Sequence, residues 1–394
     1  MHMKRIIYFH QYFNVPAMGG SVRSFELAME MSKKYNVTVI TSARNASNNR
    51  VKTEYISSGF KIIWIPNRYS NMMSFSSRML SFVLFMLKTV KYSVTEKADI
   101  VISTSTPLTI AIPGLLHKMC YRSRFIFEVR DSWPKVPIEL GVLNNPILIF
   151  LAKYLEKFTY KYADHVVALS PGMAVDIREV HSETKVTVIP NFCNNISIDA
   201  ITPFRFSNEI ESGGKIILYA GTFGYVNNMD YIVDLAAALR EFDYKFVLVG
   251  DGKCKVDTIS YAQKLGVLNL NVFIYDAVDK NKIYSMIKRS DAMISTVIDH
   301  PAMWANSANK FFDSLAFLKP VIINHKGWLA DLILENNIGL VLEPFVASDV
   351  ADKMLNMFDI STAEMSIRAA KLSRGEFSFR SILNKYETVL DGDI

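Results

Sequence analysis

Asn-Ser-Ala-Asn-Lys-Phe-Phe-Asp-Ser-Leu-Ala-Phe-Leu-Lys-Pro-Val-Ile-Ile, residues 306–323, joins a short amphipathic pattern directly to an apolar one. The spacing predicts a helix that follows a polar loop and leads into a buried strand. The first backbone N–H groups of such a helix have no partner within it, so they and the Lys310 ammonium could bind one anion. Asp313 follows about one turn later, where its carboxylate could accept hydrogen bonds from a ribose. The pair indicates a nucleotide-sugar site, although a surface helix with an unrelated Lys and Asp would have the same spacing.

The same alternation of apolar runs and helical patterns extends through both halves of the chain. It is typical of parallel sheets with crossover helices. The predicted strands are 4–9, 37–41, 61–65, 99–103, 124–129, 165–169 and 186–189, then 215–220, 244–249, 271–275, 292–295, 320–323 and 339–341. We therefore expect an α/β protein with two doubly wound, Rossmann-like domains facing a cleft, in which ligands lie beyond the carboxyl ends of the strands.

The length of 394 residues also favours two domains of similar size. The pattern is interrupted after Pro190, where a stretch containing Asn, Ser and Gly predicts a linker. We expect a first domain at 1–190, a linker at 191–214, a second domain at 215–376 and a terminal helical segment at 377–394.

The charges are unevenly distributed. Residues 1–190 contain 24 Lys and Arg against 13 Asp and Glu, a net charge of +11, whereas the remainder has a net charge of −5. The first domain should therefore face an anionic partner, either lipid head groups or a phosphorylated acceptor. Nucleic acid is not expected as a partner, because the chain contains no recognisable binding motif or basic run.

No apolar run reaches the roughly 20 residues that span a bilayer. The nearest candidate is Leu80 to Leu87, which Arg78, Lys88 and Lys91 flank. This run predicts either a buried helix or one that dips into a membrane surface. Three scattered cysteines without a C-x-x-C pair indicate neither a zinc site nor a disulfide framework, and they fit a reducing cytoplasm.

Two segments of the first half are candidates for chemistry. Gly19 and Gly20 lie between the first strand and a helix, where they could let the backbone approach a phosphate, although an ordinary turn would also contain glycines. Glu128, Arg130 and Asp131 lie at the end of an otherwise apolar strand. Because charge inside a sheet is costly, these side chains should lie at its mouth, either in an active site or as an ion pair that caps the strand.

A longer pattern carries a family resemblance. The order Lys310, Asp313, Ala316, Lys319-Pro320-Val321-Ile322 follows Lys-x-x-Glu/Asp-Tyr-x-Ala-x-Gly-Lys-Pro-Val-Ile, with Ser314 and Leu318 in place of Tyr and Gly. With Arg130-Asp131-x-Trp133-Pro134, it makes the chain resemble the family-4 retaining glycosyltransferases of GT-B fold, especially the bacterial N-acetyl-L-fucosamine transferase type.

The resemblance implies roles for particular residues. Asp131, Glu128 and Arg130 would be catalytic, with either carboxylate orienting the acceptor hydroxyl or the donor sugar. The donor site would use Gly19, Gly20, Thr222 and Lys310 for the diphosphate, Asp313 for the ribose, Ala277 and Val278 for the base, and Trp304, Asn306 and Asn309 for the sugar. Thr222 and Asn227 stand where many members have Arg and Lys, and Ala305 stands where many have Glu.

The expected activity is transfer of a sugar, of the N-acetylated deoxyhexosamine class, from a UDP-linked donor with retention of anomeric configuration. The acceptor would be a glycan on polyprenyl pyrophosphate, used for bacterial O-antigen or capsule at the inner face of the cytoplasmic membrane. No cofactor is expected and no metal, because no D-x-D follows an internal strand. Two alternatives remain: a non-catalytic relative that binds nucleotide sugars, and a dinucleotide oxidoreductase, against which the missing G-x-G-x-x-G argues.

Overall fold

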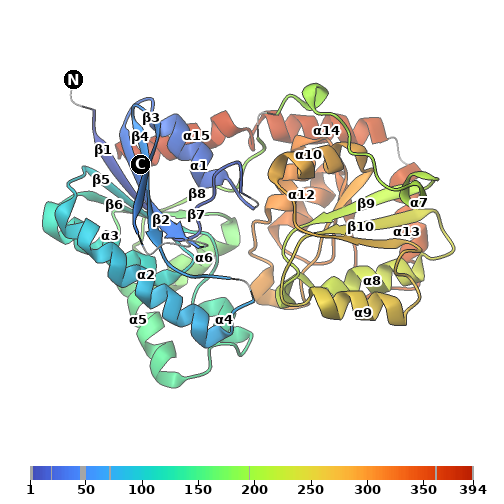
Figure 1. Cartoon of the computed structure of the whole chain (residues 1–394), viewed down its shortest axis with the longest axis horizontal. Helices are drawn as coiled ribbons and strands as arrows, with labels where there is room; N and C mark the ends of the chain where they lie inside the picture. The colour runs from blue at the N-terminus through green and yellow to red at the C-terminus, as the bar shows by residue number, and fades with distance from the viewer. Residues whose placement is uncertain are drawn as a thin grey trace. The chain divides into compact units, whose positions relative to one another are not determined.

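The computed structural model describes residues 3–18, 20–44, 50–70, 72–194, 196–359 and 362–392. The chain divides into two compact units, each a sheet covered by helices (Figure 1). Unit 1 consists of Met1–Val15, Val22–Pro190 and Leu383–Ile394, and unit 2 of Pro16–Ser21 and Asn191–Ile382.

Unit 1 is built on an eight-stranded sheet in the order β3-β4-β2-β1-β5-β6-β7-β8. Its strands are β1 (Arg5–Phe9), β2 (Asn36–Ala43), β3 (Lys52–Ser57), β4 (Phe60–Pro66), β5 (Ile100–Thr104), β6 (Arg124–Val129), β7 (His165–Ala168) and β8 (Val186–Val188). All pairs are parallel except β3 with β4. The inner strands are buried on both faces, which explains their continuous apolar runs.

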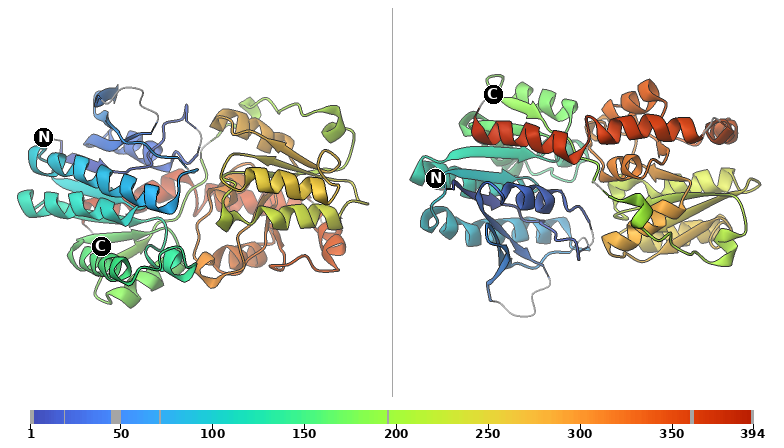
Figure 2. Two further views of the ribbon diagram at one scale, coloured as in Figure 1. Left: turned by 60° about the horizontal axis from the view of Figure 1, so that its bottom comes forward. Right: turned by 90° about the horizontal axis from the view of Figure 1, so that it is seen from above.

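Helices cover both faces of this sheet. They are α1 (Arg23–Met31), α2 (Phe75–Thr95), α3 (Ala111–Tyr121) after the 3₁₀ turn η1 (Leu108–Ile110), α4 (Lys135–Glu139), α5 (Pro146–Tyr162), α6 (Pro171–Val180) and α15 (Phe379–Asp391). Helices α1 and α15 cover one face, whereas α2, α3 and α5 cover the other (Figures 1 and 2). Helix α15 begins within unit 2 and belongs to unit 1 from Leu383 onward.

Unit 2 is built on a six-stranded parallel sheet in the order β11-β10-β9-β12-β13-β14. Its strands are β9 (Lys215–Ala220), β10 (Tyr244–Val249), β11 (Val272–Tyr275), β12 (Ala292–Ser295), β13 (Val321–Ile323) and β14 (Gly339–Val341). Its helices and 3₁₀ turns are η2 (Ile198–Ala200), α7 (Asn208–Glu211), η3 (Tyr225–Asn227), α8 (Met229–Ala238), α9 (Lys255–Lys264), α10 (Lys280–Arg289), η4 (Pro301–Met303), α11 (Asn309–Ala316), α12 (Trp328–Asn336), α13 (Val350–Asp359) and α14 (Thr362–Arg374).

The strand order reverses at one place in each sheet. In unit 1 the chain runs outward from β1 to β2 on one side and from β5 to β8 on the other, and in unit 2 the reversal lies between β9 and β12. Ligands of doubly wound sheets bind at the carboxyl ends of the strands at such a point. The loops after β1 and β5, and after β9 and β12, are therefore the places to look for a site.

The α/β prediction and the predicted strand positions are confirmed by these two parallel sheets. Strand β3 was not predicted, because it is an antiparallel edge strand whose alternate residues face solvent and leave no apolar run. Within the described residues, none of the helices combines the length and apolar character needed to cross a bilayer.

Candidate functional site

The loop after β9 and the start of α11 meet at the strand-order reversal of unit 2. Lys310, in the first turn of α11, extends its Nζ to 4.7 Å from the centroid of the Tyr219 ring. A Cβ added to Gly221 would lie 2.8 Å from Lys310 Cε and 2.9 Å from its Nζ. The end of the lysine side chain therefore passes directly over the backbone of this loop, and a side chain at position 221 would displace it.

The charge on Lys310 is sensitive to its surroundings. Burial lowers the pKa of Lys310 to about 8, with the Asp313 carboxylate opposing the shift and the Lys280 ammonium adding to it. Lys280 Nζ lies 2.7 Å from Asp313 Oδ2, and both side chains are largely buried. Asp313, predicted to contact a ribose, is thus paired with Lys280 in this structure.

Lys280 is a functional candidate that the sequence analysis missed. It is the first residue of α10, directly after Asp279, whose side chain caps the helix by accepting from Lys282 N. Its position next to the loop assigned to the base was the available signal. The arrangement places the Lys310 ammonium and the ion pair of Lys280 and Asp313 at α11, whose first N–H groups favour an anion.

The other predicted donor residues lie in the loops around this point. Thr222 is exposed in the β9 loop, and Ala277 is exposed after β11, while Val278 packs partly against the core beneath α10. Trp304 and Asn306 are half-buried in the segment after β12. Asn306 donates through Nδ2 to Met303 O at 2.6 Å, so its side chain shapes the turn that precedes α11.

Asn309 is exposed at the start of α11, where its Oδ1 accepts from Ser21 Oγ at 3.4 Å. Ser21 ends the segment Pro16–Ser21, which groups with unit 2. Gly20 is exposed in this segment, and Gly19 lies outside the described residues. The structure therefore brings Lys310, Asn309 and the Gly221 loop together.

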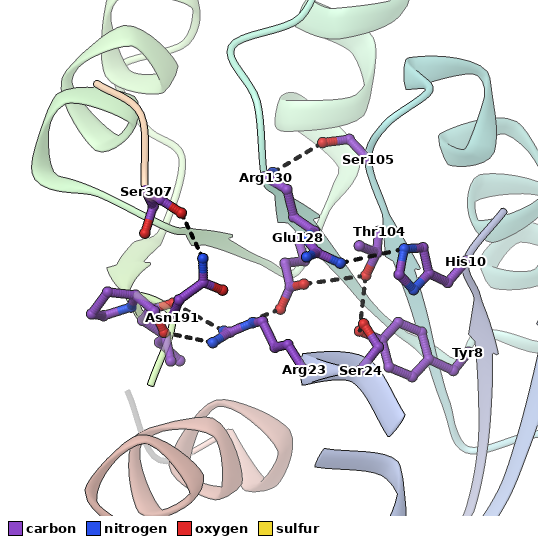
Figure 3. A network of polar contacts seen from close by, with 12 residues as sticks. Tyr8, His10, Arg23, Ser24, Thr104, Ser105, Glu128, Arg130, Asn191 and Ser307 are labelled. Carbon is purple, nitrogen blue, oxygen red and sulfur yellow. Dashed lines mark hydrogen bonds and ion pairs between the residues drawn. The ribbon is translucent and has the colours of Figure 1, made fainter. Parts of the chain in front are cut away.

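In unit 1, Glu128 is fully buried near the end of β6. Arg23 Nη2 lies 3.5 Å from Glu128 Oε2, and the same guanidinium donates to Ile189 O at 3.0 Å and to Pro190 O at 2.5 Å (Figure 3). Thr104 Oγ1 donates to Glu128 Oε1 at 3.5 Å. These contacts give Glu128 a structural position in the interior, and its predicted catalytic role stays a prediction.

Arg130 and Asp131 lie beyond the end of β6, closer to solvent. Asp131 is exposed and accepts from Thr106 Oγ1 at 2.6 Å. Arg130 Nη1 lies 3.4 Å from His10 Nε2, and Figure 3 shows the two side chains pointing toward each other. Of the three predicted catalytic residues, Asp131 is therefore the carboxylate that a substrate could reach.

His10 is a second residue that the sequence analysis did not select. It follows β1 directly and is buried, and burial lowers its pKa well below the usual value, with the Arg130 and Arg44 charges adding to the shift. The imidazole is therefore neutral near pH 7, and Nε2 accepts from Arg130. The signal was a polar residue at the carboxyl end of the first buried strand.

A cavity of about 410 Å³ opens beside the end of β6, beneath α4, α5 and α6. Its wall combines apolar side chains, among them Ile138 and Met173, with Lys135 and Glu156. Burial raises the pKa of the Glu156 carboxyl to about 7, so that carboxyl is partly protonated near neutral pH. The cavity thus has a mixed apolar and polar wall, which includes Val129 and Ser132 on either side of Asp131 in the sequence.

Among the residues that the structure describes, no group of three or more His, Cys, Asp and Glu side chains is placed to hold a metal ion. The prediction of a metal-independent reaction stays a prediction.

Two doubly wound units of this kind are the architecture of a GT-B glycosyltransferase. Two family models match the chain, "Glycosyltransferase Family 4" over residues 18–195 and "Glycosyl transferases group 1" over residues 200–372. The chain belongs to the GT-B glycosyltransferases that combine these two domains.

Solved structures share the fold over nearly the whole chain. Sucrose-phosphate synthase from Thermosynechococcus elongatus superposes with a TM-score of 0.77 at 14% identity, covering 99% of this chain and 98% of that one. HepE of Anabaena, solved in complex with UDP-glucose, superposes with a TM-score of 0.68 at 14% identity, covering 99% and 100%. At this identity the likeness establishes the fold.

The curated relatives match a smaller part of the chain. Alpha-D-kanosaminyltransferase of Streptomyces kanamyceticus is 23% identical over 58% of this chain and 60% of its own length. An uncharacterised glycosyltransferase of Methanocaldococcus jannaschii is 20% identical over 57% of this chain and 59% of its own length. The chain spans about three fifths of the length of these relatives. The N-acetyl-L-fucosamine transferase subgroup is not among these findings.

Proposed function

We propose that this protein transfers a sugar from a UDP-linked donor to a lipid-carried glycan. The observation that carries the donor half is Lys310, whose ammonium lies over the glycine loop after β9 with Lys280 nearby. The Lys310 ammonium at a helix N-terminus, beside the ion pair of Lys280 and Asp313, suits the phosphoryl groups of a nucleoside diphosphate. HepE, a structural neighbour, was solved with UDP-glucose, which supports the choice of nucleotide.

The acceptor half of the proposal depends on unit 1. We place the acceptor hydroxyl near Asp131, the exposed carboxylate beyond β6, and the carrier lipid at the inner face of the cytoplasmic membrane. The basic excess of residues 1–190 supports a pyrophosphate carrier or an anionic membrane surface. We further propose that the anomeric configuration is retained and that the sugar is an N-acetylated deoxyhexosamine used in surface polysaccharide.

The donor proposal is tested by Lys310→Ala. Because a hydrogen bond to a charged group contributes about 1.5–3 kcal/mol, we expect UDP to bind roughly ten- to a hundredfold more weakly to the variant. Uridine lacks phosphate and should bind nearly as before. Isothermal titration calorimetry measures both affinities, with Lys264→Ala, an exposed lysine of α9, as the matched control. Equal weakening of UDP and uridine would show that Lys310 does not serve the phosphates.

A non-catalytic nucleotide-sugar-binding protein is the alternative that specific residues favour. Thr222 and Asn227 leave the β9 loop without a side-chain cation. A thermal-shift screen of nucleotide sugars would identify the donor, and incubation of the labelled donor with extracted lipid carriers would then separate the two functions. Binding without transfer or hydrolysis would establish the alternative.

A further inference from the structure

Helix α5 presents to solvent the side that its sequence would be expected to bury. The apolar stripe has helical spacing and consists of Ile147, Phe150, Leu151, Tyr154 and Phe158. Ile147 and Phe150 are each 68% exposed, and Tyr154 is 61% exposed. The side of α5 that packs on unit 1 carries Glu156, Thr159 and Tyr160 instead. The helix is therefore amphipathic with its apolar side outward.

The aromatic side chains of this stripe form a continuous row. Phe150 and Tyr154 stack with ring centroids 6.5 Å apart, and Tyr154 and Phe158 stack at 6.1 Å. The row continues to Tyr162, whose ring lies 4.4 Å from that of Phe158. These contacts join the rings into one row along α5.

Helix α2, on the same side of the sheet, also has apolar side chains exposed to solvent. Its exposed apolar residues also follow helical spacing and are Leu80, Val83, Leu84, Leu87 and Val94, whereas Phe82 and Phe85 are buried beneath them. One side of the segment Leu80 to Leu87 is therefore buried and the other is exposed, and the alternative of a helix that dips into a membrane surface stays a prediction.

Helix α3 lies between α2 and α5, as Figure 2 shows, and adds Met119, which is 73% exposed. We call the exposed apolar residues of these three helices the α2–α5 face; it consists of Leu80, Val83, Leu84, Leu87, Val94, Met119, Ile147, Leu148, Phe150, Leu151, Tyr154 and Tyr162. Exposed apolar side chains on three neighbouring helices are typical of an interaction site.

The charges of the three helices decide what this face binds. Their basic residues are Arg78, Lys88, Lys91, Lys118, Lys153, Lys157 and Lys161, and their one acidic residue is the buried Glu156. The chain has 44 Lys and Arg and 38 Asp and Glu, so the remainder holds 37 of each. The whole net charge of +6 therefore resides in these three helices.

Part of this charge is engaged locally, since Lys118 pairs with Asp164 at 2.7 Å and Lys88 donates to Pro66 O. Lys153, Lys157 and Lys161 recur every four residues and line one flank of α5, beside the aromatic row. Long lysine side chains in this position can extend their ammonium groups to a phosphate layer while the rings enter an apolar one.

A second copy of this chain is a poorer occupant. Apposing two α2–α5 faces would bring the basic flanks together with no exposed acidic residue on the three helices to pair with them. An anionic bilayer supplies both the apolar layer and the negative charge.

We propose that the α2–α5 face docks this protein on an anionic lipid bilayer, with α5 lying in the head-group plane and its aromatic row inserted. The inference rests on the proposed function in one respect, because a lipid-carried acceptor requires the enzyme to work at a membrane. It identifies α5 as the main inserting element, which the sequence analysis did not select.

The test is flotation of the whole protein with vesicles of phosphatidylcholine and phosphatidylglycerol, compared with vesicles of phosphatidylcholine alone. We expect binding to the anionic vesicles only. The variant Phe150→Ser/Tyr154→Ser should bind them at least about tenfold more weakly, because it removes the inserted rings. Each Lys near an anionic surface strengthens partitioning about fivefold, so Lys153→Gln/Lys157→Gln/Lys161→Gln should lose about a hundredfold.

The matched control is Val256→Ser/Ile367→Ser, which removes two apolar side chains of unit 2 that are each 70% exposed. It should bind vesicles as the wild type does. Circular dichroism and UDP titration of every variant check the fold, and neither involves a membrane. Equal vesicle binding by the α5 apolar variant and the wild type would overturn the proposal. Equal binding to both vesicle types would overturn it as well.

Failure of this proposal differs from failure of the proposed function, because flotation uses no donor. A protein that floats but does not bind UDP refutes the donor site alone. One that binds UDP but does not float refutes the docking face alone.

Discussion

Lys310 has a pKa at the upper edge of the physiological pH range. Its pKa of about 8, lowered mainly by burial, means that it is mostly protonated at pH 7 and mostly neutral at pH 9 before a ligand binds. A bound diphosphate would favour the charged form, so binding and protonation should be coupled. The Asp313 carboxylate opposes this lowering of the pKa of Lys310, and the Lys280 ammonium adds to it.

The coupling predicts a pH dependence. Between pH 7 and 9 an increasing fraction of Lys310 is the neutral amine, which must take up a proton when UDP binds. The affinity for UDP should therefore fall by roughly tenfold for each pH unit above the pKa of Lys310. Titration calorimetry across this range checks it. Lys310→Met should bind weakly with a flat profile, and a slope that persists in this variant would assign the titration to another group.

At the scale of the element, α11 ends in a Schellman motif with an unusual residue. Lys319 N donates to Ser314 O at 3.0 Å, and Leu318 N donates to Leu315 O at 3.0 Å. This geometry places Leu318 at a φ of 57°, the left-handed region that favours glycine. Leu318 is also the residue at which the chain departs from the Gly of the family pattern. The backbone therefore keeps the left-handed turn although the residue has a Cβ, which is strained in this conformation.

We therefore expect Leu318→Gly to be more stable than Leu318→Ala by about 1 kcal/mol, since both lose the side chain and only Ala retains a Cβ in the left-handed region. Urea unfolding of both variants measures the difference. Ile367, an exposed residue within α14, is the control, because Gly there should be about 1 kcal/mol less stable than Ala. The same order of stability at both positions would contradict a strained Leu318.

At the scale of the whole molecule, Arg23 connects distant parts of unit 1. Its guanidinium joins α1 to Glu128 on β6 and to the carbonyl groups of Ile189 and Pro190, where unit 1 passes into Asn191. The side chains of Arg23 and Glu128 are both buried, so each of these two charges is compensated by the other.

Arg23→Met should lower the free energy of unfolding by about 3–5 kcal/mol, because it leaves the Glu128 carboxylate unpaired in the interior. Arg23→Met/Glu128→Leu should recover at least about 2 kcal/mol by removing that charge. Denaturant unfolding measures both. Lys34→Met is the surface control: Lys34 pairs with Glu387 at 2.6 Å but is 62% exposed, so its loss should cost less than about 1 kcal/mol. A double variant no more stable than the single one would show that packing, and not charge, holds this region.

The fold could be predicted because a parallel strand buried on both faces is a continuous apolar run. This held for inner strands such as β5 and β10 and failed for β3, whose exposed alternation resembles a loop. The helix of Lys310 could be predicted from its polar start. The position of Lys280 beside Asp313 could not, because their distance depends on how α10 and α11 pack.

Local periodicity and charge were enough to predict the two largely parallel sheets, the helix that begins at Asn309 and the basic character of residues 1–190. Which charged groups are buried together, and which apolar side chains face outward, followed only from the packing of distant segments. Glu128 has its partner on another element, and α5 has its apolar side outward because the sheet is covered by its polar side. Both depend on contacts between segments far apart in the chain, which local patterns do not encode.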